Sequence, residues 1–164
     1  MFADRILRRP TPGNVGAVGY GHRYAYLLWG LTLLFALRVL GQAVQRWLPQ
    51  EFLPPAAAFQ GSELPYGLLF AAQLLILAIM ARFSRRVQTA ALRASRHSGK
   101  ILAWAGSVYM TAALGRLVLG LLVSDAPAWF HARIPAIWHI VLASFLLVMA
   151  SFHARESARL RPGA

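Results

Sequence analysis

Four long apolar segments, separated by polar or proline-containing stretches, make up most of this chain of 164 residues. They run from about 24 to 48, 65 to 81, 101 to 123 and 134 to 152. At about 1.5 Å of rise per helical residue, such segments suit a hydrocarbon layer about 30 Å thick. Backbone inside hydrocarbon must satisfy its own hydrogen bonds, which favours helices. The pattern therefore predicts an all-α protein, a bundle of four transmembrane helices that forms a single membrane domain over residues 1–164.

The composition is also that of a membrane protein. Of the residues, 58% are hydrophobic and 13% are charged, whereas soluble domains average about 45–50% apolar and about 25% charged residues. Residues 1–23 and 153–164 flank the apolar segments and are rich in arginine. We expect both to be cytoplasmic tails, and the N-terminal tail to be flexible.

The basic residues determine the predicted topology. The chain has 17 Lys and Arg against 5 Asp and Glu, a balance that also occurs in proteins that bind nucleic acids. Here the basic residues cluster in both tails and between the second and third apolar segments. This is the positive-inside pattern, so we expect no nucleic-acid partner. It predicts a bacterial inner (cytoplasmic) membrane protein whose termini and basic loop are cytoplasmic, with the loop beside anionic lipid.

The sequence contains no recognisable catalytic machinery. It has no cysteine, which excludes a disulfide framework and thiolate metal sites. It also lacks a glycine-rich phosphate loop, a nucleophile–base pair and a carboxylate within any apolar segment. The missing membrane carboxylate argues against a proton-coupled exporter. We therefore expect a non-enzymatic protein without catalytic or metal-binding residues.

Polar residues within the apolar segments are the best candidates for a binding site: Arg38, Gln42, Gln45, Gln73, Arg116 and His139. The first three are spaced four and three residues apart, so they share one helix face. Counted from the cytoplasmic ends of their helices, both arginines lie at a depth of about 21–22 Å. His139 lies five residues inside the outer end of its predicted helix. We expect the two arginines and His139 to form one layer in the outer half of the membrane.

Two interpretations of this layer remain open. Charged groups inside a membrane cost about 2.5–3.5 kcal/mol each, so they require compensation. In the first interpretation, the arginines extend to the outer headgroups or pair with the outer-loop acids Glu51, Glu63 and Asp125. In the second, they bind an anionic ligand such as a carboxylate, a phosphate or a haem propionate.

Small residues recur at every fourth position of the third apolar segment: Ala103, Ser107, Thr111 and Gly115. Such a ridge lets helices approach each other closely in lipid. The third helix is therefore predicted to be the packing centre of the bundle or an interface to another membrane subunit.

Two histidines of the fourth segment, His139 and His153, are fourteen residues apart. They lie within about 40° of one helix face and about 21 Å apart. The spacing resembles that of the fourth helix of bacterial four-helix di-haem b-type cytochromes, where it supplies one axial ligand to each of two haems. The resemblance implies haem b, with His22 as the partner of His153. Residues 60–67 contain no counterpart of the family's second-helix ligand, so one haem at His22 and His153 fits better than two.

Three functions follow from these patterns. The first is a non-enzymatic accessory or assembly subunit that packs against partner helices or lipid. The second is a b-type haem or other tetrapyrrole-binding electron-transfer protein. The third is a small carrier or binder of an anionic or lipid molecule at the outer polar cluster.

Overall fold

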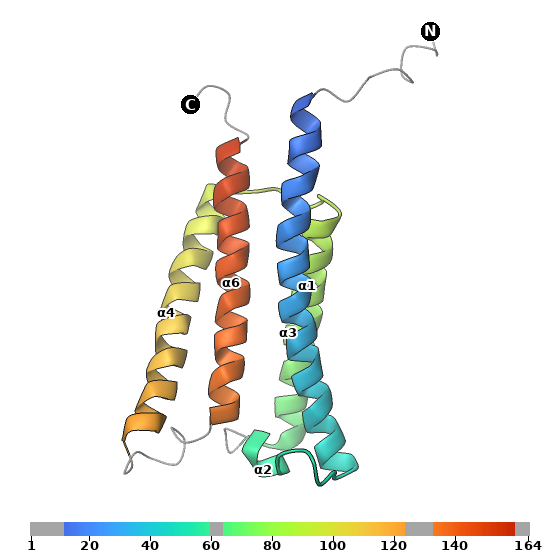
Figure 1. The fold of residues 1–164 in the computed structure, drawn as a ribbon, viewed down its shortest axis with the longest axis vertical. Helices are drawn as coiled ribbons and strands as arrows, with labels where there is room; N and C mark the ends of the chain where they lie inside the picture. The colour runs from blue at the N-terminus through green and yellow to red at the C-terminus, as the bar shows by residue number, and fades with distance from the viewer. Residues whose placement is uncertain (1–11, 60–63, 124–132, 160–164) are drawn as a thin grey trace.

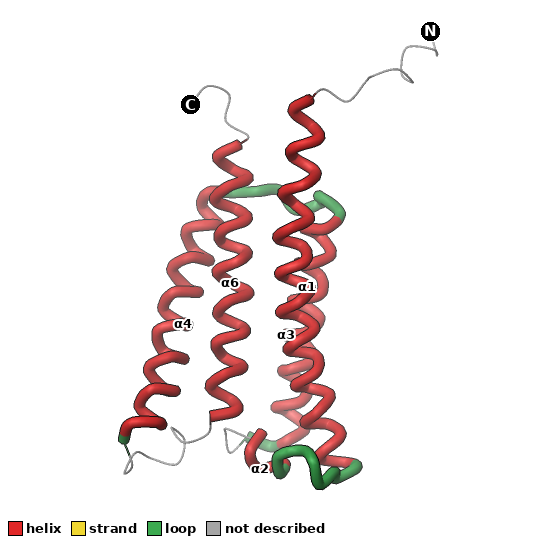
Figure 2. The backbone as a smooth tube through the Cα atoms, in the orientation of Figure 1, coloured by secondary structure: helices red, strands yellow, loops and turns green. Residues whose placement is uncertain are grey.

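The computed structural model describes residues 12–59, 64–123 and 133–159, and within them every regular element is a helix (Figures 1 and 2). The elements are α1 (Pro12–Trp47), α2 (Ala56–Phe59), α3 (Tyr66–Gln88), α4 (Arg96–Leu122) and α6 (Arg133–Arg159). The four long helices each contain an apolar stretch that can cross a membrane. The predicted fold class is confirmed: the protein is an integral membrane protein with four candidate spans, packed as a bundle.

The two ends of the bundle differ. The start of α1, the end of α6 and the α3–α4 connection lie at one end, and α2 lies at the other (Figure 1). We call the first the basic end, because exposed arginines such as Arg82, Arg85 and Arg93 gather there, and the second the distal end. The assignment of the basic end to the cytoplasm rests on these arginines alone and stays a prediction.

All four long helices are longer than the apolar pattern indicates, and α4 begins at Arg96, five residues before the predicted segment. Helix α3 continues from residue 81 to Gln88, because Ser84 and Val87 remain buried while Arg85 and Arg86 point outward. In this last part of α3, one face still packs against the bundle although the opposite face is polar. Likewise, residues 153–159 extend α6, and residues 12–23, which we expected to form a flexible tail, are helical. The helical start at Pro12 suits proline, which tolerates the first turn.

The long helices pack in the order α3, α1, α6 and α4, with the α4–α6 contact the most extensive. Among the described residues, α3 makes no comparable contact with α4 or α6. The core follows one stripe of α1, with Leu28, Phe35 and Val39, and meets Phe145 and Met149 of α6. Adjacent helices therefore pack along the series from α3 through α1 and α6 to α4, whereas α3 and α4 leave a gap between them.

Buried small residues bring α4 against α6, and they recur at every seventh position: Gly99, Gly106, Ala113 and Gly120. A Cβ atom on Gly106 would come within 2.9 Å of Leu147 Cδ2. On Gly99 it would come within 3.1 Å of His153 Cβ. The close approach of the two helices therefore depends on the missing side chains at these positions.

The ridge predicted from sequence does not perform this packing. Ala103, Ser107, Thr111 and Gly115 are all exposed. A Cβ on Gly115 would meet nothing within 4 Å. The expectation that this ridge is the packing centre of the bundle is therefore corrected. Small residues occupy two neighbouring stripes of α4, and the sequence does not say which stripe faces α6.

Candidate functional site

The four long helices and the short helix α2 contribute to one cavity of about 310 Å³ in the distal half of the bundle. Its polar lining comes from α1, α3, α4 and α6: Arg38, Gln73, Arg116 and His139. The remaining walls are apolar and include Phe35 and Trp138. We call this space the distal cavity. Four of the six polar residues singled out from the sequence therefore line the same space.

Arg38 is held between helices. Its side chain is 8% exposed. Its Nη2 donates a hydrogen bond of 3.3 Å to the carbonyl oxygen of Phe59, the last residue of α2. Its Nε is buried and has no hydrogen-bond partner among the described residues. The short helix α2 thus positions the guanidinium of Arg38, whose Nε–H remains available to donate a hydrogen bond.

Two glutamines form the polar wall beside this arginine. Gln73 Nε2 donates to Gln42 Oε1 at 3.1 Å, and both side chains are buried. Gln73 Oε1 is also buried and has no hydrogen-bond partner among the described residues. Gln42, which does not line the cavity, therefore orients the side chain of Gln73, and the Oε1 atom of Gln73 remains available to accept a hydrogen bond. A buried polar atom without a partner costs about 1–3 kcal/mol, so such atoms require an explanation.

The opposite wall is built from α4 and α6. Arg116 is buried, and His139 is half-buried. The hydroxyl of Tyr109 forms a short hydrogen bond with His139 Nδ1. Tyr109 was not a candidate from the sequence, because a tyrosine inside an apolar segment is unremarkable. It precedes Arg116 by seven residues, which puts both on one face of α4, and this spacing could have indicated it.

The described lining of the cavity carries positive charge. Two guanidinium groups line it, and none of the described lining residues carries a carboxylate. Glu51 is exposed, and the other two outer-loop acids, Glu63 and Asp125, lie outside the described residues. A guanidinium presents a planar fork of N–H donors that matches carboxylate and phosphate oxygens, so this lining suits an oxyanion.

Gln45, the sixth residue of the predicted set, has another role. Its Oε1 accepts a hydrogen bond of 3.0 Å from the backbone N–H of Gln50. It therefore stabilises the chain where α1 ends and does not line the distal cavity. The stripe predicted on α1 holds only for Arg38 and Gln42.

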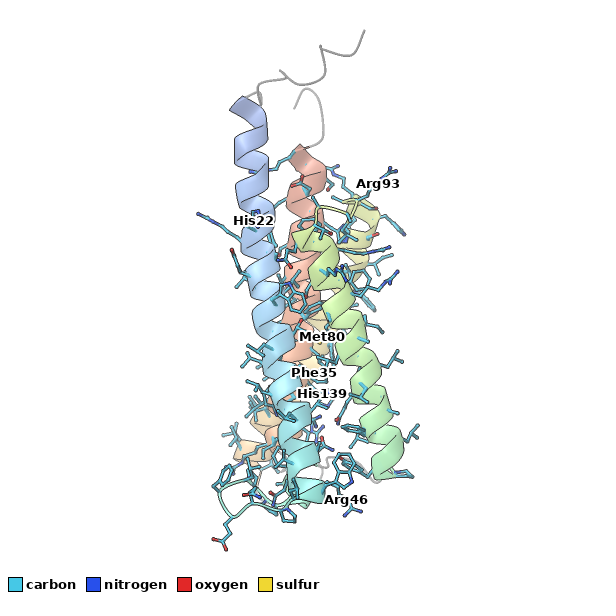
Figure 3. The ribbon with its side chains drawn as sticks, turned by 90° about the vertical axis from the view of Figure 1, so that its right-hand side faces the viewer. His22, Phe35, Arg46, Met80, Arg93 and His139 are labelled. Carbon is cyan, nitrogen blue, oxygen red and sulfur yellow. The ribbon has the colours of Figure 1, made fainter. Side chains whose placement is uncertain are left out.

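The three histidines of the haem hypothesis have separate environments. His22 is exposed on α1, far along the bundle from His139 (Figure 3). His153 is buried, and its Nδ1 accepts a hydrogen bond of 3.1 Å from the backbone N–H of Ser95. A neutral imidazole that accepts at Nδ1 carries its proton on Nε2, which then has no lone pair for iron. This geometry lends the haem hypothesis no support, and it stays a prediction.

The described residues contain no group of three or more His, Cys, Asp or Glu that could hold a metal ion. Comparison with known proteins finds no match: no family model, no curated protein and no solved structure matches the chain. Functional inference therefore rests on the chemistry of the distal cavity.

Proposed function

We propose that this membrane protein binds the anionic headgroup of an amphipathic molecule in the distal cavity, with Arg38 and Arg116 as the binding cations. The observation that carries the proposal is the convergence of two buried guanidinium groups from α1 and α4 on one largely apolar cavity. A cation inside a membrane costs about 2.5–3.5 kcal/mol on insertion scales. A bound oxyanion would offer the open Nε of Arg38 an acceptor and would lie beside the guanidinium of Arg116.

The open hydrogen-bonding atoms indicate the chemistry of the headgroup. Arg38 Nε offers a donor, and Gln73 Oε1 offers an acceptor. A bare carboxylate satisfies only the donor. A headgroup that carries a hydroxyl or N–H beside its anion satisfies both, as a phosphate monoester or a hydroxylated phosphodiester does.

The competing interpretation is a structural cluster in which Glu63 or Asp125 pairs with an arginine. The two interpretations differ in what the acids do. If the cluster is structural, Glu63→Gln or Asp125→Asn destabilises the protein as strongly as loss of the arginine. If the cavity binds a ligand, both variants retain ligand binding.

The test is binding of dodecyl phosphate to protein purified in a non-ionic detergent, measured by native mass spectrometry and titration. Dodecylphosphocholine, with the same chain and a zwitterionic head, is the control probe. We expect saturable binding of dodecyl phosphate, weakened about tenfold or more in Arg38→Gln and Arg116→Gln, because hydrogen bonds to charged groups contribute about 1.5–3 kcal/mol. Arg46→Gln, at an exposed position of α1, is the matched control and should bind normally. Wild-type affinity in Arg38→Gln, or equal affinity for the two probes, would overturn the proposal.

A second candidate is the accessory or assembly subunit. It is favoured by the exposure of Ser107, Thr111 and Gly115 on the outer face of α4, where a small-residue ridge faces no other helix of the described chain. Small residues in this pattern let a helix of another protein approach. A partner that copurifies reproducibly with the wild type and is lost with Gly115→Leu supports this candidate. A clean monomer in both cases counts against it.

A further inference from the structure

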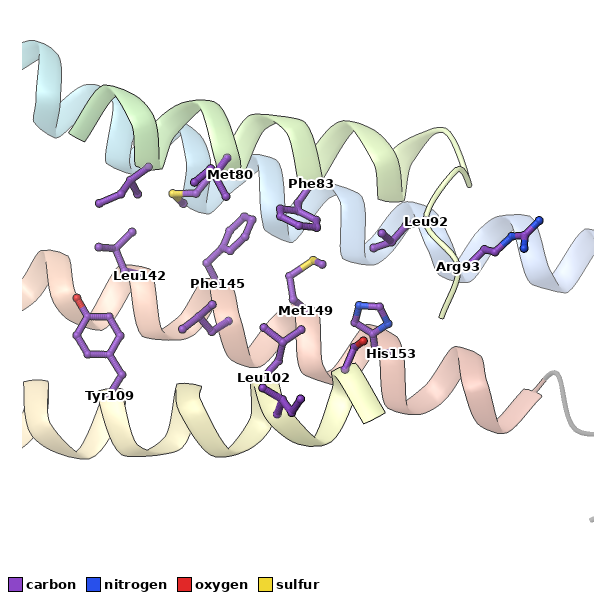
Figure 4. Close-up of a pocket in the computed structure, with 15 residues that line it drawn as sticks. Met80, Phe83, Leu92, Arg93, Leu102, Tyr109, Leu142, Phe145, Met149 and His153 are labelled. Carbon is purple, nitrogen blue, oxygen red and sulfur yellow. The ribbon is translucent and has the colours of Figure 1, made fainter. Parts of the chain in front are cut away.

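A larger hollow lies next to the distal cavity. Because α3 and α4 do not pack on each other, a groove of about 610 Å³ separates them, with α6 as its floor (Figure 4). Its walls include Met80 and Phe83 of α3, Leu102 of α4, and Phe145 and Met149 of α6. We call this space the α3/α4 groove.

The groove and the distal cavity are adjacent and share lining residues. Ile76 of α3 and Leu142 of α6 line both. Tyr109 lines the groove, and its hydroxyl contacts His139, which lines the cavity. The Tyr109–His139 pair therefore lies between the distal cavity, which two arginines line, and the largely apolar groove.

The dimensions of the groove match part of a lipid. It runs along α6 from Leu142 to His153, and Figure 4 shows Tyr109 and Leu142 toward one end and His153 toward the other. Eleven helical residues rise by about 16 Å. This is about half of the hydrocarbon thickness of a bilayer, which is the depth that one acyl chain occupies in one leaflet.

We propose that the α3/α4 groove holds the hydrocarbon chain of the molecule whose anionic headgroup binds in the distal cavity. The ligand is then a long-chain anionic amphiphile taken sideways from the bilayer through the gap between α3 and α4. This inference rests on the proposed function, and it names the class of ligand. Two guanidinium groups in the distal cavity and largely apolar groove walls, with Arg93, Ser98 and His153 as the polar lining toward the basic end, argue for a single molecule that spans both spaces.

The groove contributes selectivity more than affinity. Hydrocarbon that leaves the bilayer for an apolar groove exchanges one apolar surrounding for another, so the hydrophobic effect adds little. Van der Waals fit along the walls instead discriminates between chains by shape. The headgroup site therefore determines whether the ligand binds, and the groove determines where its chain lies.

The test is photolabelling of the purified full-length protein with hexadecyl phosphate that carries a diazirine at the end of its chain. Hexadecanol with the same diazirine is the neutral control. We expect hexadecyl phosphate to label groove residues in the basic half, such as Leu102 and Met149, and hexadecanol to label the lipid-facing surface without preference. Label sites are identified by peptide mass spectrometry.

Matched variants separate the groove from the headgroup site. Ile79 lines the groove and is 45% exposed, whereas Leu75, one turn away on α3, is 63% exposed and does not line it. Ile79→Trp should reduce groove labelling several-fold while dodecyl phosphate binding stays dependent on Arg38, and Leu75→Trp should change neither. Label outside the groove in the wild type, with Arg38-dependent binding intact, would overturn the inference and leave the proposed function standing. Absence of Arg38-dependent binding would overturn both.

Discussion

The two halves of the bundle bury polar side chains in different ways. In the basic half, Thr32 Oγ1 donates to the carbonyl oxygen of Leu28 at 2.7 Å. Its single proton is then used, so the hydrogen bond of 3.2 Å between Thr32 and Ser84 has Ser84 as its donor. Both hydroxyl groups are neutral and satisfied. In the distal half, Arg38 Nε and Gln73 Oε1 are buried without a partner among the described residues.

This difference distinguishes buried polar groups that stabilise the fold from buried polar groups that are available to a ligand. A closed pair such as Thr32–Ser84 joins α1 to α3 and leaves nothing for a ligand to satisfy. An open pair of atoms in a positive cavity is unfavourable until something fills it. Arginines also have different environments in the two halves. Arg85 is exposed at the basic end, where its charge can determine topology, whereas Arg38 is buried in the distal half.

The largest expected effect is at Arg38. Arg38→Met removes a buried cation whose effective burial penalty is several kcal/mol, and it keeps an apolar chain of similar length. We expect the ligand-free protein to gain about 2 kcal/mol in free energy of unfolding and to lose dodecyl phosphate binding. Denaturant unfolding in detergent and the binding titration measure the two changes. Destabilisation by Arg38→Met would show that this arginine is structural, and the contrast between the halves would fail.

A smaller effect of opposite sign is expected at Ser84. Ser84→Ala removes a fully buried hydrogen bond to Thr32 and should lower the free energy of unfolding by about 1 kcal/mol. Binding at the distal cavity should not change. Ser151→Ala is the control, because Ser151 is exposed and its hydroxyl donates to the Leu147 carbonyl of its own helix. Equal stability of the two variants would mean that the Thr32–Ser84 pair does not join the helices.

Depth could be predicted from the sequence because every helical residue adds the same rise. Counting residues therefore placed Arg38, Arg116 and His139 in one layer, and the structure brings them to one cavity. The helix ends were less predictable. Helix α3 continues to Gln88 because one of its faces remains packed beyond the end of the apolar segment.

The direction in which each helix faces could not be read in the same way. It depends on the neighbouring helices, which the sequence of one helix does not contain. Gln45 therefore turned out to bond Gln50, and the Ala103–Gly115 ridge turned out to be exposed. Tyr109 was missed for the same reason, since its partner His139 is on another helix. The cavity is formed by the four long helices and α2 together.

The smallest expected effect is at the rim of the basic half, where Trp29 Nε1 donates to Gln88 Oε1 at 2.8 Å. Both side chains are exposed, so water or headgroups can replace either partner. Trp29→Phe should lower the free energy of unfolding by about 0.5 kcal/mol or less. Trp104→Phe, at an exposed position of α4, corrects for loss of the indole itself. The Trp29–Gln88 bond is shorter than the bond of 3.1 Å between Gln73 and Gln42 in the distal half. A loss above about 1 kcal/mol at Trp29 would mean that this rim is closed to water, and the contrast between the two halves would weaken.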